Sequence, residues 1–127
     1  MTTRVLVAED EPNIVESLSF ILIRSGCNVT SVSDGEAALT SIRAEKPNVV
    51  ILDVMLPKMN GFEVLKAVRS DASVKDIPII ILTAKGQSQD RRMAEEIGAN
   101  AFVTKPFSNQ HIIETVQKLT SSSGELT

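Results

Sequence analysis

Four of the apolar runs in this sequence are followed by a charged or hydroxyl side chain. Glu9 and Asp10 follow the first run, Asp53 the third, Thr83 the fourth and Lys105 the fifth. If these runs are parallel strands of one open sheet, their carboxyl ends lie along the edge where such sheets bind ligands. We therefore expect the five side chains to share one pocket.

This set of side chains is typical of phosphoryl transfer. Three carboxylates raise one another's pKa values unless a cation joins them, and an oxygen-only cluster suits Mg²⁺. No histidine or cysteine stands at these strand ends to indicate zinc. Asp53 is expected to attack phosphorus and form an acyl phosphate. Lys105 neutralises oxygens of the transferring group, and Thr83 donates a hydrogen bond to one of them.

The stretch around Asp53 organises the chain. Residues 49–52 are four branched apolar residues in a row, which predicts a strand buried on both faces. Pro57 follows closely and excludes further regular pairing. Asp53 is thus expected at the carboxyl end of a central strand, beside an apolar core.

The remaining pattern is five repeats of strand then helix, which predicts a doubly wound α/β fold with a parallel sheet. We expect the flavodoxin-like strand order 2-1-3-4-5, which makes the first, third and fourth strands neighbours. Ser108 is a candidate cap for the last helix. One domain is expected over residues 1–120, and the serine-rich residues 121–127 are expected to form a flexible tail. The expected strands lie at residues 5–8, 28–32, 49–52, 79–82 and 101–104.

Composition excludes several classes of function. The 127 residues carry a net charge of -3 without basic runs, which argues against direct nucleic-acid or membrane binding. Four Phe without Trp or Tyr offer no stacking platform for single-stranded nucleic acid. The single cysteine excludes an intrachain disulfide and a cysteine metal cluster. We expect a cytoplasmic protein with no membrane helix.

The sequence resembles the receiver domain of the response-regulator family, the phosphoacceptor half of two-component signalling. The resemblance covers residues 4 to 120. Four motifs carry it, in the order and at the strand ends that the family requires: VLVAEDEP, VVILDVMLPKMNGFEVL, IIILTA and FVTKPF.

The resemblance implies a role for each matching residue. It implies that Asp53 is the phosphorylation site and that Mg²⁺ is held by Glu9, Asp10, Asp53 and the backbone carbonyl of Met55. It implies that Thr83, Lys105 and the amide of Ala84 contact the phosphoryl group, and that Lys105-Pro106 is a cis peptide bond. It also implies that Phe102 turns inward on phosphorylation, which reshapes the face of the fourth helix, fifth strand and fifth helix.

Two residues depart from the family pattern. The family more often has Asp where Glu9 stands, and the extra methylene is expected to allow water-mediated metal contact. Phe102 replaces the more common Tyr, so any switching there depends on packing alone. Met55 and Lys85 occupy variable positions that border the phosphoryl group, and we expect a change at Lys85 to alter the lifetime of the phosphoryl group more than folding.

Other functions fit the sequence less well. A haloacid-dehalogenase-like phosphatase needs a second Asp where Met55 stands. The six glycines show no dinucleotide-binding or Walker A spacing, and a flavodoxin needs hydroxyls after the first strand. A receiver that has become a constitutive interaction module stays open because of Glu9.

The resemblance implies a phosphorylation-controlled binding module that catalyses only its own phosphorylation and dephosphorylation. Its expected partners are a histidine kinase or histidine phosphotransfer protein and an unknown downstream protein. It is expected to be a monomer or a phosphorylation-dependent dimer, and either a stand-alone receiver or part of a longer regulator.

Overall fold

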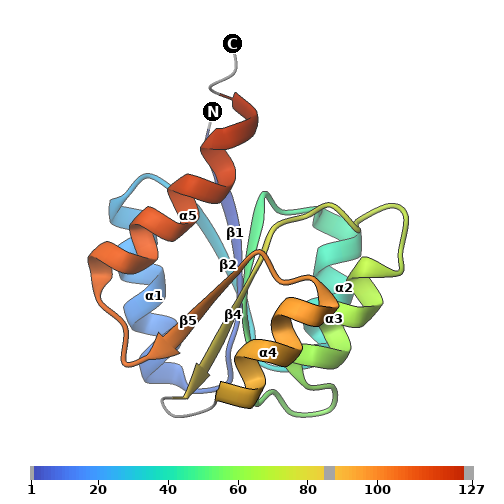
Figure 1. The fold of residues 1–127 in the computed structure, drawn as a ribbon. Coiled ribbons are helices and arrows are strands. Elements are labelled where there is room, and N and C mark those ends of the chain that lie inside the picture. Colours follow the sequence, from blue (N-terminus) through green and yellow to red (C-terminus); the bar gives the residue numbers. More distant parts are fainter. Residues whose placement is uncertain (1, 85–87, 125–127) are drawn as a thin grey trace.

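The computed structural model describes residues 2–84 and 88–124 as a parallel sheet between two layers of helices (Figure 1). The strands are β1 (Arg4–Ala8), β2 (Asn28–Val32), β3 (Val49–Asp53), β4 (Ile79–Ala84) and β5 (Ala101–Lys105). The helices are α1 (Pro12–Arg24), α2 (Gly35–Glu45), α3 (Gly61–Arg69), α4 (Ser88–Ile97) and α5 (Asn109–Gly124). The order of the strands is β2-β1-β3-β4-β5, as predicted. Helices α1 and α5 cover one face, and α2, α3 and α4 cover the other.

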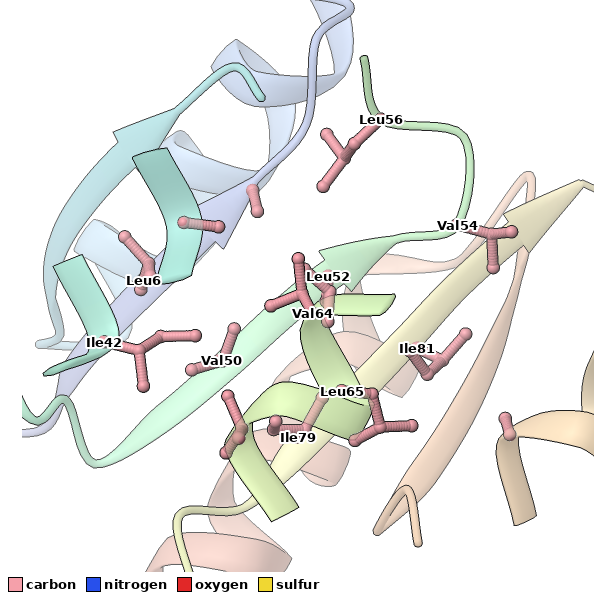
Figure 2. Close-up of a cluster of buried hydrophobic side chains, with 14 of the residues drawn as sticks. Leu6, Ile42, Val50, Leu52, Val54, Leu56, Val64, Leu65, Ile79 and Ile81 are labelled. Carbon is pink, nitrogen blue, oxygen red and sulfur yellow. The ribbon is translucent and has the colours of Figure 1, made fainter. Parts of the chain in front are cut away.

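Strand β3 is buried along its whole length because it lies at the centre of the sheet. Its side chains alternate between the two layers: Val50 and Leu52 pack toward α2, α3 and α4, while Val49 and Ile51 pack toward α1 and α5. Figure 2 shows the first of these two clusters. Burial on both faces explains the unbroken apolar run of β3. Close packing also makes this strand rigid, which fixes the position of Asp53 at its end.

Three of the helices begin at a side chain that caps their first turn. Asp34 accepts a hydrogen bond from the amide of Ala37 at 2.7 Å and so caps α2. Asn60 and Glu63 form a reciprocal capping box at α3, with both hydrogen bonds at 2.9 Å. The predicted cap at Ser108 is confirmed, since its hydroxyl accepts from the amide of the residue three positions later at 3.0 Å.

The loop after β3 is pressed against the strand end at Gly61. A Cβ atom on Gly61 would lie 2.4 Å from the carbonyl oxygen of Asp53, which is closer than real Cβ contacts come. The amide of Gly61 also donates to the carbonyl of Val54 at 2.9 Å. The absence of a side chain at this position therefore lets α3 begin directly beside the candidate acceptor.

Arg69 joins the end of α3 to the end of α4. Its guanidinium donates to the carbonyl of Gly98 at 2.9 Å and to the side-chain oxygen of Asn100 at 2.8 Å. The same group donates to the carbonyls of Lys75 and Ile77 at 2.8 and 3.0 Å. Burial lowers the pKa of Arg69, although the charge of a nearby aspartate opposes this effect. Hydrogen bonds from Arg69 thus hold the residues just after α4 against the loop between α3 and β4.

The flexible tail over residues 121–127 stays a prediction, although the first four of these residues extend the last helix. Helix α5 continues to Gly124, so the backbone of residues 121–124 is helical where a flexible tail was expected. No proline or glycine interrupts residues 109–123, and serine alone does not stop a helix that is already formed. Residues 125–127 lie outside the described part of the chain. So does Lys85, for which the sequence predicted an effect on the lifetime of the phosphoryl group.

Candidate functional site

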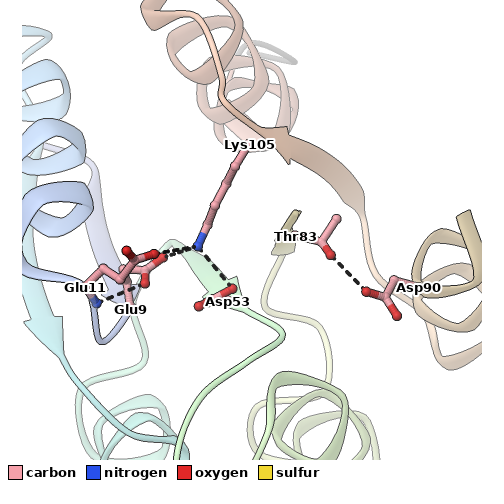
Figure 3. Close-up of polar contacts among 6 residues, drawn as sticks. All are labelled: Glu9, Glu11, Asp53, Thr83, Asp90 and Lys105. Carbon is pink, nitrogen blue, oxygen red and sulfur yellow. Dashed lines mark hydrogen bonds and ion pairs between the residues drawn. The ribbon is translucent and has the colours of Figure 1, made fainter. Parts of the chain in front are cut away.

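The predicted strand-end residues meet at one edge of the sheet (Figure 3). Ala8 pairs with Leu52 and Asp53 pairs with Leu82, so the ends of β1, β3 and β4 lie side by side. Parallel pairing explains this meeting, because every carboxyl end points to the same edge.

Lys105 is the cation at the centre of this group. Its ammonium lies 3.0 Å from Oε1 of Glu9, 3.5 Å from Oδ1 of Asp53 and 3.7 Å from Oε1 of Glu11. The side chains of Glu9 and Asp53 are 0% and 4% exposed, whereas that of Glu11 is 64% exposed. The two buried carboxylates therefore share one positive charge.

Glu9 is buried more completely than an isolated carboxylate tolerates. Its Oε2 accepts a hydrogen bond from the amide of Glu11 at 3.1 Å. Its Oε1 accepts no hydrogen bond of good geometry within the described residues and has only the ion pair with Lys105. Burial raises the pKa of Glu9 and the charge of Asp53 adds to this effect, while the Glu11 amide and Lys105 oppose it.

Lys105 remains a cation in this setting. Burial by itself lowers the pKa of Lys105, but the contact with Glu9 and the charges of Asp53 and Glu11 outweigh burial and raise it. A protonated lysine beside a buried carboxylate can neutralise an incoming anionic group.

Three carboxylates form a candidate divalent-metal site. Glu9, Asp10 and Asp53 each offer an oxygen, and these oxygens all lie within 4.8 Å of one another. Glu9 and Asp53 are buried and Asp10 is exposed, so the cluster opens to solvent on one side. An all-oxygen donor set with a buried, under-coordinated oxygen on Glu9 fits a hard cation such as Mg²⁺.

The hydroxyl of Thr83 is turned away from Asp53. Thr83 is 3% exposed, and its Oγ1 donates to Oδ2 of Asp90 at 2.9 Å. Figure 3 shows Asp90, on α4, on the side of Thr83 that is remote from Asp53. Sequence patterns alone do not single out Asp90, because an acid in the first turn of a helix is ordinarily explained by the helix dipole.

The other predicted residues surround this centre. Ala84 is the exposed last residue of β4, and Met55 is 76% exposed in the loop after β3. Phe102 is half-buried against the core, with the guanidinium of Arg91 5.5 Å from the centre of its ring. The Lys105-Pro106 peptide bond is cis, as predicted.

Comparison with known proteins matches residues 5–117 to the response regulator receiver domain. The chain belongs to the response regulator receiver domain family. It is 42% identical over 119 residues to the alkaline phosphatase synthesis transcriptional regulatory protein PhoP of Bacillus subtilis, covering 94% of this chain and 49% of PhoP. The receiver thus spans about half the length of this curated relative.

Solved receiver structures share its fold. The chemotaxis response regulator CheY4 of Vibrio cholerae has a TM-score of 0.87 at 31% identity, covering 94% of this receiver and 99% of CheY4. The receiver domain of the sensor histidine kinase PA1611 of Pseudomonas aeruginosa has a TM-score of 0.88 at 26% identity, covering 95% of this receiver and 99% of that chain. The latter structure holds a magnesium ion in its active site cleft.

Within residues 2–84 and 88–124, no helix is both long enough and apolar enough to cross a membrane.

Proposed function

We propose that this receiver accepts a phosphoryl group on Asp53 in a Mg²⁺-dependent reaction. A carboxylate oxygen of Asp53 forms a bond to phosphorus while the bond from phosphorus to the donor breaks, which gives an aspartyl phosphate. The observation that carries this proposal is the buried carboxylate of Asp53, with Lys105 3.5 Å away and two more carboxylates in the same cluster.

Each residue of the proposed site has its own role in the phosphoryl transfer. Asp53 is the nucleophile, and Lys105 balances negative charge on the phosphoryl oxygens. Thr83 donates a hydrogen bond to one oxygen, and the amide of Ala84 to another. Glu9, Asp10, Asp53 and the carbonyl of Met55 would hold Mg²⁺, which draws charge from the phosphoryl oxygens when bound.

We further propose the partners that the family implies. The donor is a histidine kinase or histidine phosphotransfer protein, in which a nitrogen–phosphorus bond breaks as the acyl phosphate on Asp53 forms. The receiver also takes its phosphoryl group from small acyl phosphates, because Asp53 and its neighbours supply the chemistry. It has no separate substrate, and it hydrolyses only its own aspartyl phosphate.

The proposed output is a change in the face formed by α4, β5 and α5. Phe102 turns inward, which alters binding of a downstream protein or of a second copy. The net charge of -3 does not support direct DNA contact by these residues, although PhoP is named as a transcriptional regulator. We place the receiver in the cytoplasm, where such kinases present their phosphohistidine.

The proposal is tested by intact-mass spectrometry after incubation with acetyl phosphate, with Mg²⁺ or with excess chelator. We expect the mass to increase by one phosphoryl group only with Mg²⁺. If a folded, Mg²⁺-binding protein gains no phosphoryl group, the proposal is wrong and the receiver is a constitutive interaction module.

Mg²⁺ affinity should fall as the pH falls through the raised pKa of Glu9. Metal binding requires the ionised carboxylate, so protons compete with Mg²⁺ below that pKa, which lies above the ordinary glutamate value because of burial. Calorimetric titration with Mg²⁺ at a series of pH values, beginning near the ordinary glutamate pKa and rising above it, measures this dependence. Glu9→Gln should bind Mg²⁺ more weakly and lose most of this pH dependence, and an unchanged profile would exclude Glu9 from the metal site.

A further inference from the structure

The hydrogen bond between Thr83 and Asp90 competes with the proposed role of Thr83. The hydroxyl of Thr83 is buried and donates to Asp90 at 2.9 Å. A threonine hydroxyl has one proton to donate, so it cannot serve Asp90 and a phosphoryl oxygen at the same time. A bond to a carboxylate is charge-assisted, so Asp90 is a strong competitor for this proton.

We propose that Asp90 is a positioning residue that keeps the Thr83 hydroxyl away from Asp53 until a phosphoryl group draws it over. This inference rests on the proposed phosphorylation of Asp53. Two anionic acceptors lie on opposite sides of Thr83, Asp90 on α4 and the phosphorylated Asp53 on β3 (Figure 3). The Thr83 hydroxyl therefore donates its hydrogen bond to whichever of the two acceptors is stronger.

Release of Asp90 also bears on the position of α4. Asp90 lies in the first turn of α4, while the other end of α4 is held by the hydrogen bond from Arg69 to Gly98. When Thr83 turns to the phosphoryl group, α4 loses a polar contact at its amino end and keeps the one at its carboxyl end. Arg91, the next residue, lies over the ring of Phe102. A shift of the first turn of α4 therefore moves a side chain that contacts Phe102.

The inference makes a prediction about stability in two states. Without a phosphoryl group, Asp90→Ala should lower the melting temperature, because a buried hydroxyl loses its acceptor. In the presence of Mg²⁺ and beryllofluoride, a stable mimic of the phosphoryl group, Asp90→Ala should have the same melting temperature as the wild type, because Thr83 then donates its hydrogen bond to the mimic. A residue with only a structural role would lower the melting temperature equally in both states.

The same variant should bind the mimic more tightly. Calorimetric titration with beryllofluoride in Mg²⁺ should give about tenfold higher affinity for Asp90→Ala, because the mimic no longer competes with a charge-assisted hydrogen bond. Asp90→Asn keeps an acceptor oxygen but loses the charge, so its affinity should lie between those of the wild type and Asp90→Ala. Glu96→Ala, an exposed change on the same helix, should alter neither measurement.

The outcomes separate this inference from the proposed function. If the wild type binds no beryllofluoride and takes no phosphoryl group, the proposed function is wrong and the role of Asp90 is overturned with it. If the wild type binds the mimic but Asp90→Ala binds it equally or more weakly, Asp90 does not restrain Thr83. Tighter binding by Asp90→Ala, with intermediate binding by Asp90→Asn, supports the inference.

Discussion

Asp53→Asn should abolish the gain of a phosphoryl group in the presence of acetyl phosphate and Mg²⁺. The amide of asparagine has no nucleophilic carboxylate oxygen. Among the described residues, Glu9 is the one other carboxylate that is comparably buried and paired with Lys105, and its Oε1 lies 3.0 Å from that ammonium. Intact-mass spectrometry measures the loss. Asp76→Asn, a change of the same kind at an exposed position, should leave the gain unchanged.

The loss in Asp53→Asn should not reflect unfolding. Asp53 raises the pKa of the buried Glu9, so replacing Asp53 removes a repulsive charge from the cluster. We therefore expect the variant to be at least as stable as the wild type in chemical unfolding without Mg²⁺. If Asp53→Asn still gains a phosphoryl group, the acceptor is another residue, and Glu9 is the first alternative to test.

Lys105→Met should slow phosphorylation by small acyl phosphates about 100-fold to 1,000-fold, the usual cost of removing one group that stabilises developing charge. Methionine retains most of the length of the lysine side chain but carries no charge. The rate is measured by mass spectrometry over time at saturating Mg²⁺. Lys118→Met on the exposed surface of α5 is the matched control and should react at the wild-type rate.

Lys105→Met should also destabilise the fold. Glu9 and Asp53 lose the cation that they share, and breaking a buried pair by removing one partner costs about 3 kcal/mol or more. Because Mg²⁺ replaces the missing positive charge in the proposed site, its addition should restore part of this stability. A rate within threefold of the wild type would contradict the role of Lys105 in charge balance.

The sequence predicts much of this fold because its apolar runs are long and its strands are parallel. Residues 49–52 and 79–82 have no polar interruption, and parallel topology brings the residues that follow such runs to one edge. This rule is sufficient to place Glu9, Asp53, Thr83 and Lys105 together. The cap at Ser108 follows from local chemistry alone.

Other features depend on how the elements pack and are not visible in the sequence. Glu9 and Asp10 are adjacent, yet one is buried and the other is exposed, because the chain leaves the core between them. The contact of Asp90 with Thr83 requires the position of α4 against β4. Glu11 contacts Lys105 because α1 begins beside the end of β5. The rule for parallel strand ends predicts neither the contact of Asp90 with Thr83 nor that of Glu11 with Lys105.

The most direct test of the central claim is chemical mapping of the phosphorylated residue. Borohydride reduces an aspartyl phosphate to homoserine, so treatment of the Mg²⁺- and acetyl-phosphate-treated protein, followed by peptide sequencing, identifies the acceptor. We predict homoserine at position 53 in samples with Mg²⁺ and none in samples with chelator. Modification at Asp10 or Glu9, or phosphate that survives on His111, would contradict the assignment of Asp53 as the phosphoacceptor.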